Sequence, residues 1–437
     1  MIENSFYIET YGCTSNKADS LIMRNVLIKS NYHQTDFEKA QFIIINTCAV
    51  KEQTENKIKD RLKTLNNLFK NDPDRYVIIA GCLPHITPEY KGELKKVIPS
   101  FSAIIDLNNL EDLPYIIEKL KHSKKNQIFL SNKTIDKARY FINHPKGKIT
   151  GIVPISEGCL GSCTYCCVKN ARGSLNCYDP EQIVNNIEYQ LKQGIKQIYL
   201  TSQDCSLYNH DGVELIHLIK KIVALPQDFF LRIGMINPSI LIDKIDQLIS
   251  IFNLDKVYQF LHIPIQSGSN EVLKRMQRPY LISEIIDKIE ILREKFPYLT
   301  ISTDIICGFP EETEYEFYRT INFIKWLRPE IINISKFTPR PGTEAKKMKQ
   351  LDSKLIKKRS IRLSKIFRNS LSDINDKWRD WSGKVLILHE GSGKNQAFGR
   401  NFAYKNIFVN DYHGKYGKFV DIKIIKVDGF NLFGKLI

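Results

Sequence analysis

The sequence predicts an α/β multidomain protein with three successive parts: an N-terminal parallel α/β domain, a partial (β/α)6 barrel and a small C-terminal β-barrel. Three observations predict this architecture. The chain has 437 residues, more than one ordinary hydrophobic core organises. Short apolar runs alternate with helix-length segments over most of the chain, which is typical of β/α units. After Trp381 that rhythm gives way to short β segments separated by glycine-containing turns.

The N-terminal part contains four apolar runs of strand length. The segments between them are polar and of helix length, a pattern typical of a parallel sheet covered by helices. We therefore expect a parallel α/β domain over residues 1–118, followed by a basic connector over residues 119–148. The four runs are "SFYIET" (5–10), "AQFIIINT" (40–47), "RYVIIAG" (75–81) and "FSAIIDL" (101–107).

The middle part, residues 149–372, repeats the β/α rhythm six times. Six units predict an incomplete barrel rather than a closed eightfold one. Amphipathic helices such as residues 179–194 and 283–296 lie between the expected strands. Those strands are "GIVPIS" (151–156), "QIYLTS" (197–202), "FLRIGM" (230–235), "YQFLHIPI" (258–265), "TISTDII" (300–306) and "IINISKF" (331–337).

The last part, residues 376–437, predicts a small β-barrel of the OB type. Such barrels stack bases on aromatic rings and track phosphates with basic groups, so Arg400 and Lys405 are nucleic-acid candidates. The alternative is that the rings fill a small core, and on a two-residue period we expect about half of them to face inward. The interleaved aromatic and basic residues are Phe398, Arg400, Phe402, Tyr404, Lys405 and Phe408.

The charge balance is strongly basic, with a formal net charge of +16. A basic surface attracts phosphate polyanions, although a generally basic proteome produces the same figure. The polar helical stretch 344–370 carries ten Lys/Arg against two Asp/Glu. We expect this stretch to be mainly a solvated face with some phosphate contact.

The N-terminus, "MIENSFYIET", has no apolar core of a signal peptide, and no apolar run approaches the roughly 18 residues of a membrane helix. We therefore expect a cytoplasmic protein without a membrane partner, in a compartment that keeps thiols reduced. Ten cysteines in that setting indicate metal binding or catalysis rather than disulfides.

Cys159, Cys163 and Cys166 form a C-x3-C-x2-C motif. Thiolates at this spacing can wrap one face of a small iron–sulfur cluster and leave one iron open. A structural zinc ion prefers four ligands in local pairs. No second CxxC follows, and the nearest histidines, His144 and His210, are not at ligand spacing.

The other cysteines near this motif and in the middle part have a simpler interpretation. Cys167 directly follows a ligand candidate, and adjacent residues project in different directions, so we interpret it as a bystander. Cys177, Cys205 and Cys307 are expected to be small, semi-buried residues.

A second set of three cysteines is spread along the N-terminal part. Cys13, Cys48 and Cys82 each stand just after an apolar run, although they are 35 and 34 residues apart. If those runs are parallel strands of one sheet, all three thiols lie at its carboxyl edge, where open α/β sheets bind ligands. The pattern again predicts three ligands and one open iron.

The stretch "GCLGSCTYC" (158–166) resembles the cluster loop of radical S-adenosylmethionine (SAM) enzymes. In that family the open iron of a [4Fe–4S] cluster chelates SAM, which is then cleaved to a 5′-deoxyadenosyl radical. The three-cysteine domain, the six β/α units and the basic barrel together resemble the methylthiotransferase family, whose last module is called TRAM. Stretches such as "GMINP" (234–238) and "TDIICGFP" (303–310) resemble its archaeal and eukaryotic branch.

The resemblance implies two [4Fe–4S] clusters and two SAM molecules per turnover, so that all six cysteines are catalytic through their clusters. One SAM methylates a sulfur attached to the Cys13/Cys48/Cys82 cluster, and the other is cleaved at the second cluster. The radical takes hydrogen from C2 of N6-threonylcarbamoyladenosine next to the anticodon of tRNA, and C2 captures the methylthio group. Implied partners are tRNA, a flavodoxin- or ferredoxin-like electron donor and a sulfur source.

Polar residues just past the expected strands are candidates for binding SAM, because such barrels carry function at those ends. Tyr165, inside the cysteine motif, is a further candidate near the adenine. The alternative for each is that a polar loop residue merely caps a helix, and Gly308, Phe309 and Pro310 are expected to shape a turn. The strand-end candidates are Gln203, Asp204, Arg232, Gln266 and Asp304.

Several other functions remain open at this point. A methylthiotransferase for isopentenyladenosine in tRNA or for a ribosomal protein would share the scaffold. An electron carrier would need closed four-cysteine clusters. A zinc-stabilised RNA-binding protein would contain stoichiometric zinc without iron.

Overall fold

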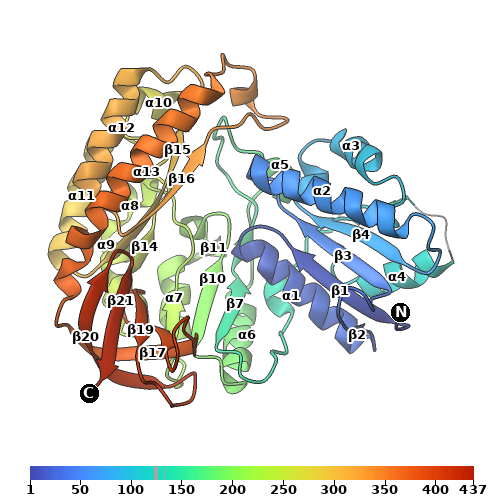
Figure 1. Cartoon of the computed structure of the whole chain (residues 1–437), viewed down its shortest axis with the longest axis horizontal. Helices are drawn as coiled ribbons and strands as arrows, with labels where there is room; N and C mark the ends of the chain where they lie inside the picture. Colours follow the sequence, from blue (N-terminus) through green and yellow to red (C-terminus); the bar gives the residue numbers. More distant parts are fainter. Residues whose placement is uncertain (123–125, 132) are drawn as a thin grey trace. The chain divides into compact units, whose positions relative to one another are not determined.

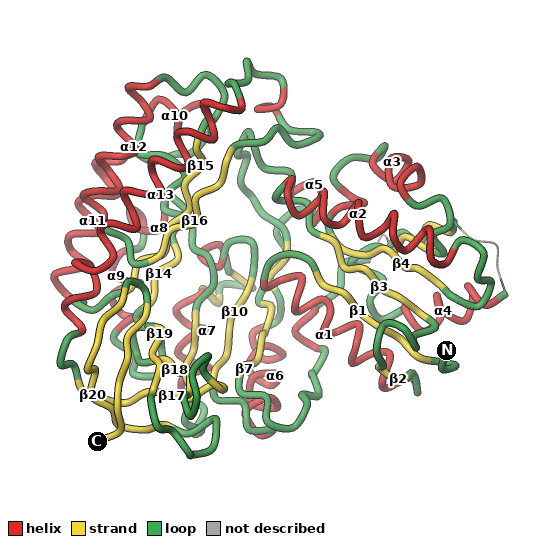
Figure 2. Tube along the Cα trace, viewed as in Figure 1, coloured by secondary structure: helices red, strands yellow, loops and turns green. Residues whose placement is uncertain are grey.

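The computed structural model describes residues 1–122, 126–131 and 133–437, and the chain divides into two compact units (Figures 1 and 2). The first unit comprises residues 1–143, 154–186 and 338–346. The second comprises residues 144–153, 187–337 and 347–437. Each unit is described by itself.

The first unit is built on a six-stranded parallel sheet with the strand order β2-β1-β3-β4-β5-β6. The predicted parallel α/β domain is thereby confirmed. Two short strands, β2 and β6, were not expected, and β6 lies within the segment expected to be a connector. The strands are β1 (Ser5–Thr10), β2 (His33–Gln34), β3 (Phe42–Thr47), β4 (Tyr76–Gly81), β5 (Ala103–Ile105) and β6 (Gln127–Phe129).

Helices cover both faces of this sheet (Figure 1). In β3, Phe42 and Ile44 pack in one hydrophobic cluster and Ile43 and Ile45 in another, so the strand is buried on both faces. This burial on both faces explains why β3 has apolar residues at successive positions, whereas a strand with one solvated face alternates apolar and polar residues. Helices α1 (Thr14–Lys29) and α4 (Leu113–Lys121) pack on the first face, and α2 (Glu52–Phe69) and α3 (Tyr90–Val97) on the second.

Residues 154–186 add a small layer of short elements to the first unit. The backbone N–H of Tyr178 donates to Ile155 O at 2.9 Å, and that of Asp179 donates to the Asp136 carboxylate at 3.0 Å. The first bond joins two ends of the layer to each other, and the second holds the layer against the chain that follows the sheet. Its elements are the antiparallel pair β8 (Ser156–Glu157) and β9 (Asn176–Cys177) and the short helix α5 (Val168–Arg172); η1 (Leu83–His85) and η2 (Lys137–Arg139) are further 3-10 turns of the unit.

The second unit contains the six β/α units that the sequence predicts. Their strands form two three-stranded sheets, β13-β10-β7 and β14-β15-β16, with a bridge between Leu231 and Val257. The strands are β7 (Thr150–Pro154), β10 (Gln197–Thr201), β13 (Phe230–Arg232), β14 (Phe260–His262), β15 (Thr300–Cys307) and β16 (Ile331–Lys336). The first helix is α6 (Pro180–Lys192), whose residues up to Asn186 belong to the first unit. The other helices are α7 (Leu215–Val223), α8 (Ser239–Asp243), α9 (Ile245–Phe252), α10 (Asn270–Arg275), α11 (Ile282–Lys295) and α12 (Glu314–Leu327). A small hairpin of β11 (Asn209–His210) and β12 (Val213–Glu214) and the turn η3 (Cys205–Leu207) interrupt the rhythm.

The long helix α13 (Ser353–Asn375) leads from the six β/α units to the C-terminal barrel (Figure 1). It begins after Asp352, whose carboxylate accepts bonds from the N–H groups of the first turn. Its buried residues, such as Leu363 and Phe367, recur at helical spacing, while most of its lysines stay on the solvated side. The basic stretch is therefore a structural helix with a solvated face. The 3-10 turns η4 (Glu344–Lys346) and η5 (Asp376–Trp378) flank it.

The C-terminal segment forms a closed five-stranded barrel with the order β17-β18-β19-β21-β20, which confirms the predicted small β-barrel. Its core includes Val385, Ile407, Ile422 and Leu432, together with the fully buried Trp378. The strands are β17 (Ser382–Glu390), β18 (Ala397–Arg400), β19 (Asn406–Val409), β20 (Phe419–Asp428) and β21 (Asn431–Leu436).

Across the residues that the structure describes, we find no helix with the length and apolar character needed to cross a membrane.

Gly81, the last residue of β4, is required by the close approach of two strands. Its φ is +92°, and a Cβ there would lie 2.3 Å from the carbonyl oxygen of Thr47. We predict that Gly81→Ala lowers the free energy of unfolding by about 3 kcal/mol or more, because β3 must shift in addition to the backbone strain. Urea unfolding followed by circular dichroism measures this loss.

Gly173 in the same unit provides the matched control. Its φ is +77°, but nothing lies within 4 Å of a Cβ built there. Gly173→Ala should therefore cost only the backbone strain, about 1–3 kcal/mol because its ψ of −166° lies in a region that is essentially restricted to glycine. Equal losses for the two variants would contradict the importance of the strand contact.

Candidate metal centres

The three N-terminal cysteines lie at one edge of the first unit's sheet. Cys48 and Cys82 directly follow β3 and β4, and Cys13 precedes the first residue of α1, three residues after β1. The register pairs Thr10 with Asn46 and Thr47 with Gly81, so the three strands end together. A Cβ on Gly12 would lie 3.1 Å from Cys48 Sγ, which shows how closely the first loop passes the second thiol. The predicted convergence of these distant cysteines is confirmed.

Two buried asparagines, Asn16 and Asn46, connect the loops that carry Cys13 and Cys48. Asn16 Oδ1 accepts from Cys13 Sγ at 3.3 Å, and Asn16 Nδ2 donates to Thr47 O at 2.8 Å, next to Cys48. Asn46 Nδ2 donates back to Asn16 O at 2.8 Å. These bonds satisfy buried polar groups and fix the start of α1 against the end of β3.

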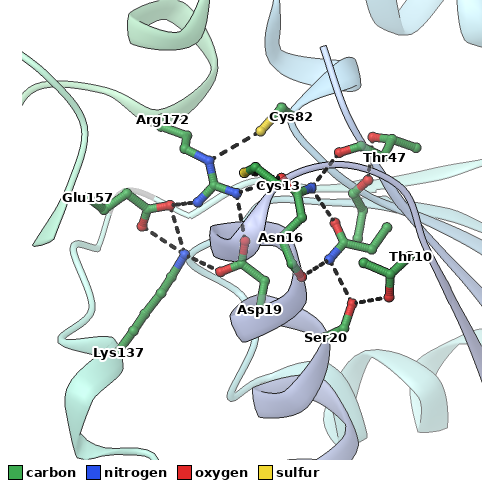
Figure 3. A network of polar contacts seen from close by, with 12 residues as sticks. Thr10, Cys13, Asn16, Asp19, Ser20, Thr47, Cys82, Lys137, Glu157 and Arg172 are labelled. Carbon is green, nitrogen blue, oxygen red and sulfur yellow. Dashed lines mark hydrogen bonds and ion pairs between the residues drawn. The ribbon is translucent and has the colours of Figure 1, made fainter. Parts of the chain in front are cut away.

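Arg172, the last residue of α5, reaches the third thiol. Its Nε donates to Cys82 Sγ at 3.2 Å, and one terminal nitrogen lies 2.7 Å from the Asp19 carboxylate. The other terminal nitrogen donates to Glu157. Lys137 Nζ completes the group, with 2.8 Å to Asp19 and 2.7 Å to Glu157 (Figure 3). We call Asp19, Lys137, Glu157 and Arg172 the charge tetrad.

The charge tetrad is deeply buried, with the Asp19, Lys137 and Arg172 side chains only 2–3% exposed. Burial alone would raise the pKa of Asp19, but Arg172 and Lys137 outweigh it and hold that pKa below its ordinary value. Conversely, burial would lower the pKa of Lys137, but Asp19 and Glu157 keep it raised. Asp19, Lys137 and Arg172 therefore stay ionised, because each has an oppositely charged partner that offsets its burial.

Burial favours the neutral thiol form of Cys48 and Cys82. Burial raises the pKa of Cys82 to about 12 even though Arg172 opposes the shift, and burial also raises the pKa of Cys48. Thiolate is the form that binds metal, so metal loading of this edge must release protons.

The second triad lies in the loop between β8 and α5 of the same unit. The loop turns so tightly that a Cβ on Gly161 would lie 3.3 Å from Cys159 Sγ and 3.9 Å from Cys163 Sγ. The N–H of Cys166 donates to Cys163 O at 3.1 Å, closing the turn. Cys159 and Cys163 are half-buried, and Cys166 is exposed.

Cys167 points away from that loop into the core. It is 2% exposed, packs in the cluster that also contains Cys48 and Cys82, and donates to Ala49 O at 3.5 Å. This packing agrees with its interpretation as a bystander. Cys205 and Cys307 are fully buried, more deeply than expected, and Cys177 pairs with Ser156 in the β8–β9 ladder.

Two family models match the chain. The "Radical SAM superfamily" matches residues 153–324, and the "Uncharacterized protein family UPF0004" matches residues 5–105. Each range contains one of the two cysteine triads. The sequence was also compared with curated proteins. A probable threonylcarbamoyladenosine tRNA methylthiotransferase of Pyrococcus horikoshii is 36% identical over 99% of this chain and 99% of its own length. The chain belongs to the radical SAM methylthiotransferase family.

Further relatives confirm the branch. A similarly named probable enzyme of Methanocaldococcus jannaschii is 36% identical over 99% of this methylthiotransferase and 96% of its own length. The threonylcarbamoyladenosine tRNA methylthiotransferase of Drosophila melanogaster is 30% identical over 99% of this chain and 77% of its own length. The predicted resemblance to an archaeal and eukaryotic branch is thus confirmed.

Solved structures show the same fold. The radical SAM methyltransferase TsrM of Kitasatospora setae has a TM-score of 0.57 at 12% identity, covering 79% of this methylthiotransferase and 77% of that chain. The cobalamin-dependent SAM radical enzyme OxsB has a TM-score of 0.53 at 13% identity, covering 85% and 56%. At identities this low, the similarity shows a shared fold and nothing more.

Membership of the radical SAM superfamily implies a [4Fe–4S] cluster and SAM. The donor set of this methylthiotransferase fits such a cluster, because each triad offers three cysteine thiols and cluster irons take thiolate ligands. In the described ranges, no three His, Cys, Asp or Glu side chains gather tightly enough to hold one metal ion. Cluster thiolates bind different irons and stand further apart than the ligands of one zinc ion.

The strand-end candidates for SAM binding lie in the second unit, and one of them, Asp204, has a structural role there. Asp204 is buried and caps η3, accepting from Ser206 N at 3.0 Å and Asn237 N at 3.2 Å. Burial raises the pKa of this carboxyl, and these bonds oppose the rise. The capping alternative therefore describes Asp204. Gln203, beside it, is half-buried, as is Tyr165 in the first unit.

The other three strand-end candidates are Arg232, Gln266 and Asp304. Arg232 ends β13 half-buried, with its guanidinium 4.7 Å from the Phe260 ring and 5.0 Å from the Tyr199 ring. Gln266 takes a left-handed φ of +75° and bridges to Ile305 through its backbone. Asp304 Oδ2 lies 3.0 Å from His262 Nε2, and both side chains are half-buried. His262, at the end of β14, is not among the site residues predicted from the sequence, because histidines entered that prediction only as possible metal ligands.

Of the two nucleic-acid candidates, the prediction for Lys405 is wrong. Its Nζ is buried and donates to Asn375 Oδ1 of α13, so it cannot contact phosphate. Arg400 remains half-buried, with its guanidinium 3.8 Å from the Tyr404 ring. Phe402 packs on the barrel core, whereas Tyr404 is buried in a separate cluster with Leu388, on which Phe398 also packs. Phe398 and Phe408 are half-buried, and each alternates with core residues along its strand.

The charge tetrad and the two asparagines were missed from the sequence. Their partners lie up to 156 residues apart, so no local motif joins them. The available signal was the run "TSNKADS" after Cys13, which places Asn16 and Asp19 on the first turns of a helix that starts at the sheet edge.

Lys405 makes the free energy of unfolding vary with pH in the alkaline range. Burial lowers its folded-state pKa from 10.5 to about 8, with Glu330 opposing the shift and Lys377 and Arg400 adding to it. Between these values the unfolded chain binds a proton that the folded chain does not, so the free energy of unfolding should rise with pH, by up to about 3 kcal/mol. This contribution is lost as the pH falls through 8. Lys405→Met should flatten the rise in urea unfolding between about pH 7.5 and pH 10, whereas an unchanged slope would contradict the assignment.

Proposed function

We propose that this methylthiotransferase converts N6-threonylcarbamoyladenosine to its 2-methylthio derivative next to the anticodon of tRNA. The observation that carries the proposal is the presence of two separate triads of cysteines in one unit, each with three thiols. The names of relatives that align over nearly the whole chain support the substrate. A flavodoxin- or ferredoxin-like electron donor and a sulfur source are part of the proposal.

The two triads have different proposed roles. Cys159, Cys163 and Cys166 would hold the cluster that binds SAM, and Cys13, Cys48 and Cys82 would hold a second [4Fe–4S] cluster. When bound, these groups supply methyl transfer to sulfur and the radical chemistry at adenine C2. The chain contributes the ligand geometry, the buried surroundings of the second site and the release of thiol protons.

In the second unit we propose that Gln203, Arg232, Gln266 and Asp304 contribute to SAM binding. Arg232 supports this most directly. Its Nε is buried and, among the described residues and atoms, has no hydrogen-bond partner. A buried donor in that state costs free energy unless a ligand accepts from it. The Asp304–His262 pair offers a carboxylate oriented by an imidazole, suited to accept from ribose hydroxyls or an amine.

For tRNA we propose a row of side chains on the outer face of the barrel, which we call the aromatic row: His389, Phe398, Phe408, Phe433 and Lys426. These residues are cross-strand neighbours from β17 to β20. The His389 ring stacks on Phe398 at 4.7 Å, Phe408 stacks on Phe433 at 5.5 Å, and Lys426 Nζ lies 5.4 Å from the Phe433 ring. Rings and cations in a row can stack bases while they track the backbone.

A cavity of about 320 Å³ adjoins one end of the aromatic row, within the second unit. His389, Phe398 and Arg400 line it together with Lys148 and Tyr199. A lining that combines aromatic rings with basic groups suits a single flipped or unstacked base.

Phe408→Ala tests the aromatic row. Stacking one base on a ring is worth about 1–3 kcal/mol, so the dissociation constant for tRNA should rise about tenfold or more. Phe430→Ala is the matched control, because Phe430 is an exposed barrel ring outside the row that packs on Phe367 at 5.6 Å. Fluorescence anisotropy with labelled tRNA measures both, and an equal effect of the two substitutions would contradict the assignment.

The proposed reaction is tested with anaerobically reconstituted enzyme, SAM and a reductant. The substrates are tRNA that bears or lacks the threonylcarbamoyl group, and nucleosides are analysed by mass spectrometry. The methylthio product should appear only on the modified tRNA. Product only on isopentenyladenosine, or only on a peptide, would refute the substrate, and stoichiometric zinc without iron would refute the enzyme class.

Cysteine variants in the same assay test the separate roles of the triads. Cys13→Ala should abolish the methylthio product but leave some 5′-deoxyadenosine formation, whereas Cys163→Ala should abolish both. Cys307→Ala, which removes a buried thiol outside both triads, serves as the control and should retain both activities. The reverse pattern for Cys13 and Cys163 would contradict the assigned roles.

A further inference from the structure

We propose that Arg172 is a positioning residue for the cluster at Cys13, Cys48 and Cys82, and that its hydrogen bond to Cys82 raises the reduction potential of that cluster. The inference rests on the proposed second cluster. The inference adds a residue, from the chain segment that follows the other triad, that affects the reduction potential of this cluster.

The sequence position of Arg172 makes this contact unusual. Arg172 ends α5, the helix that begins two residues after Cys166, so it belongs to the segment that follows the second triad. Its Nε nevertheless lies 3.2 Å from Cys82 Sγ at the sheet edge. One side chain therefore joins the chain segment of one triad to a ligand candidate of the other (Figure 3).

The orientation of the guanidinium is fixed by its other partners. Its terminal nitrogens lie against Asp19 at 2.7 Å, Glu157, and Asn16 Oδ1 at 3.3 Å. Asn16 Oδ1 also accepts from Cys13 Sγ. Because the guanidinium is planar and rigid, two carboxylates that hold its ends also aim its Nε–H at Cys82.

This geometry has a definite consequence for a bound cluster. Reduction adds one negative charge to the cluster. A fixed N–H donor and a nearby cation stabilise that charge, more strongly in a buried site than in water. Hydrogen bonds to the cluster sulfurs are among the factors that set such potentials. Removing the Nε–H should therefore make the potential more negative.

Lys137 offers a matched control within the charge tetrad. It is equally buried and lies at similar distances from the same two carboxylates, 2.8 Å from Asp19 and 2.7 Å from Glu157. Its nitrogen bonds to those carboxylates and to no thiol among the contacts of the described chain. A purely structural role of the charge tetrad predicts similar effects for changes at Lys137 and Arg172, whereas our proposal predicts different ones.

The experiment uses the full chain with Cys159, Cys163 and Cys166 replaced by alanine, so that only the N-terminal cluster can form. In this background we compare Arg172→Lys, Arg172→Met and Lys137→Met. Iron content and thermal unfolding of the metal-free protein are measured first. The cluster is then titrated with dithionite in the presence of redox mediators, and the one-electron reduced form is followed by electron paramagnetic resonance.

Arg172→Lys keeps a cation for the carboxylates but loses the planar fork. We expect this variant to bind iron and to shift the midpoint potential to a more negative value by at least about 59 mV. For one electron, that shift corresponds to a tenfold change in the equilibrium constant for reduction. Arg172→Met should shift it further, and Lys137→Met should shift it less than Arg172→Lys. If Arg172→Lys fails to bind iron while Lys137→Met of equal or lower thermal stability binds it, that result also supports a specific hold on Cys82.

Two results would overturn the inference. One is an unchanged midpoint in iron-loaded Arg172→Lys. The other is an equal loss of iron, or an equal shift, in the Lys137 and Arg172 variants, because the charge tetrad would then act only as a structural unit. Failure of the alanine background itself to bind iron would instead overturn the proposed second cluster, and the inference with it.

Discussion

The buried charge tetrad is the constraint on which the first unit depends. Asp19, Lys137, Glu157 and Arg172 come from four separate stretches of sequence, and none of them tolerates burial without the others. Breaking such a buried set by removing one partner typically costs about 3–5 kcal/mol, a large share of the stability of an average domain. The charge tetrad therefore selects the one arrangement in which the sheet, the segment after it and the loop of the second triad come together.

The parallel sheet supplies the second constraint. Because β1, β3 and β4 run in the same direction and in register, residues that follow them must meet at one edge. Three thiols separated by dozens of residues become neighbours without any local motif. The Asn16–Asn46 bonds also fix the loops of Cys13 and Cys48 against each other.

Much of this could be read from the sequence. Apolar runs of strand length located ten of the strands, and cysteines at three successive strand ends indicated a ligand edge. What failed were long-range side-chain contacts. Nothing local in "KNARG" shows that Arg172 reaches Cys82, and nothing around Lys405 shows that its ammonium turns toward Asn375. Asp204 shows a third limit, because a polar residue after a strand looks the same whether it caps a turn or binds a ligand.

The composition of the first unit also affects how the protein is made. Asp19 leaves the ribosome 153 residues before Arg172, a delay of roughly 8–30 s at ordinary synthesis rates. Arg340, which pairs with Glu55, follows later still. During that interval the first sheet is exposed to the cell with carboxylates that lack their cations. The N-terminal part therefore cannot complete its folding as it emerges, and nascent chains of this protein should depend on chaperones until most of the message has been translated.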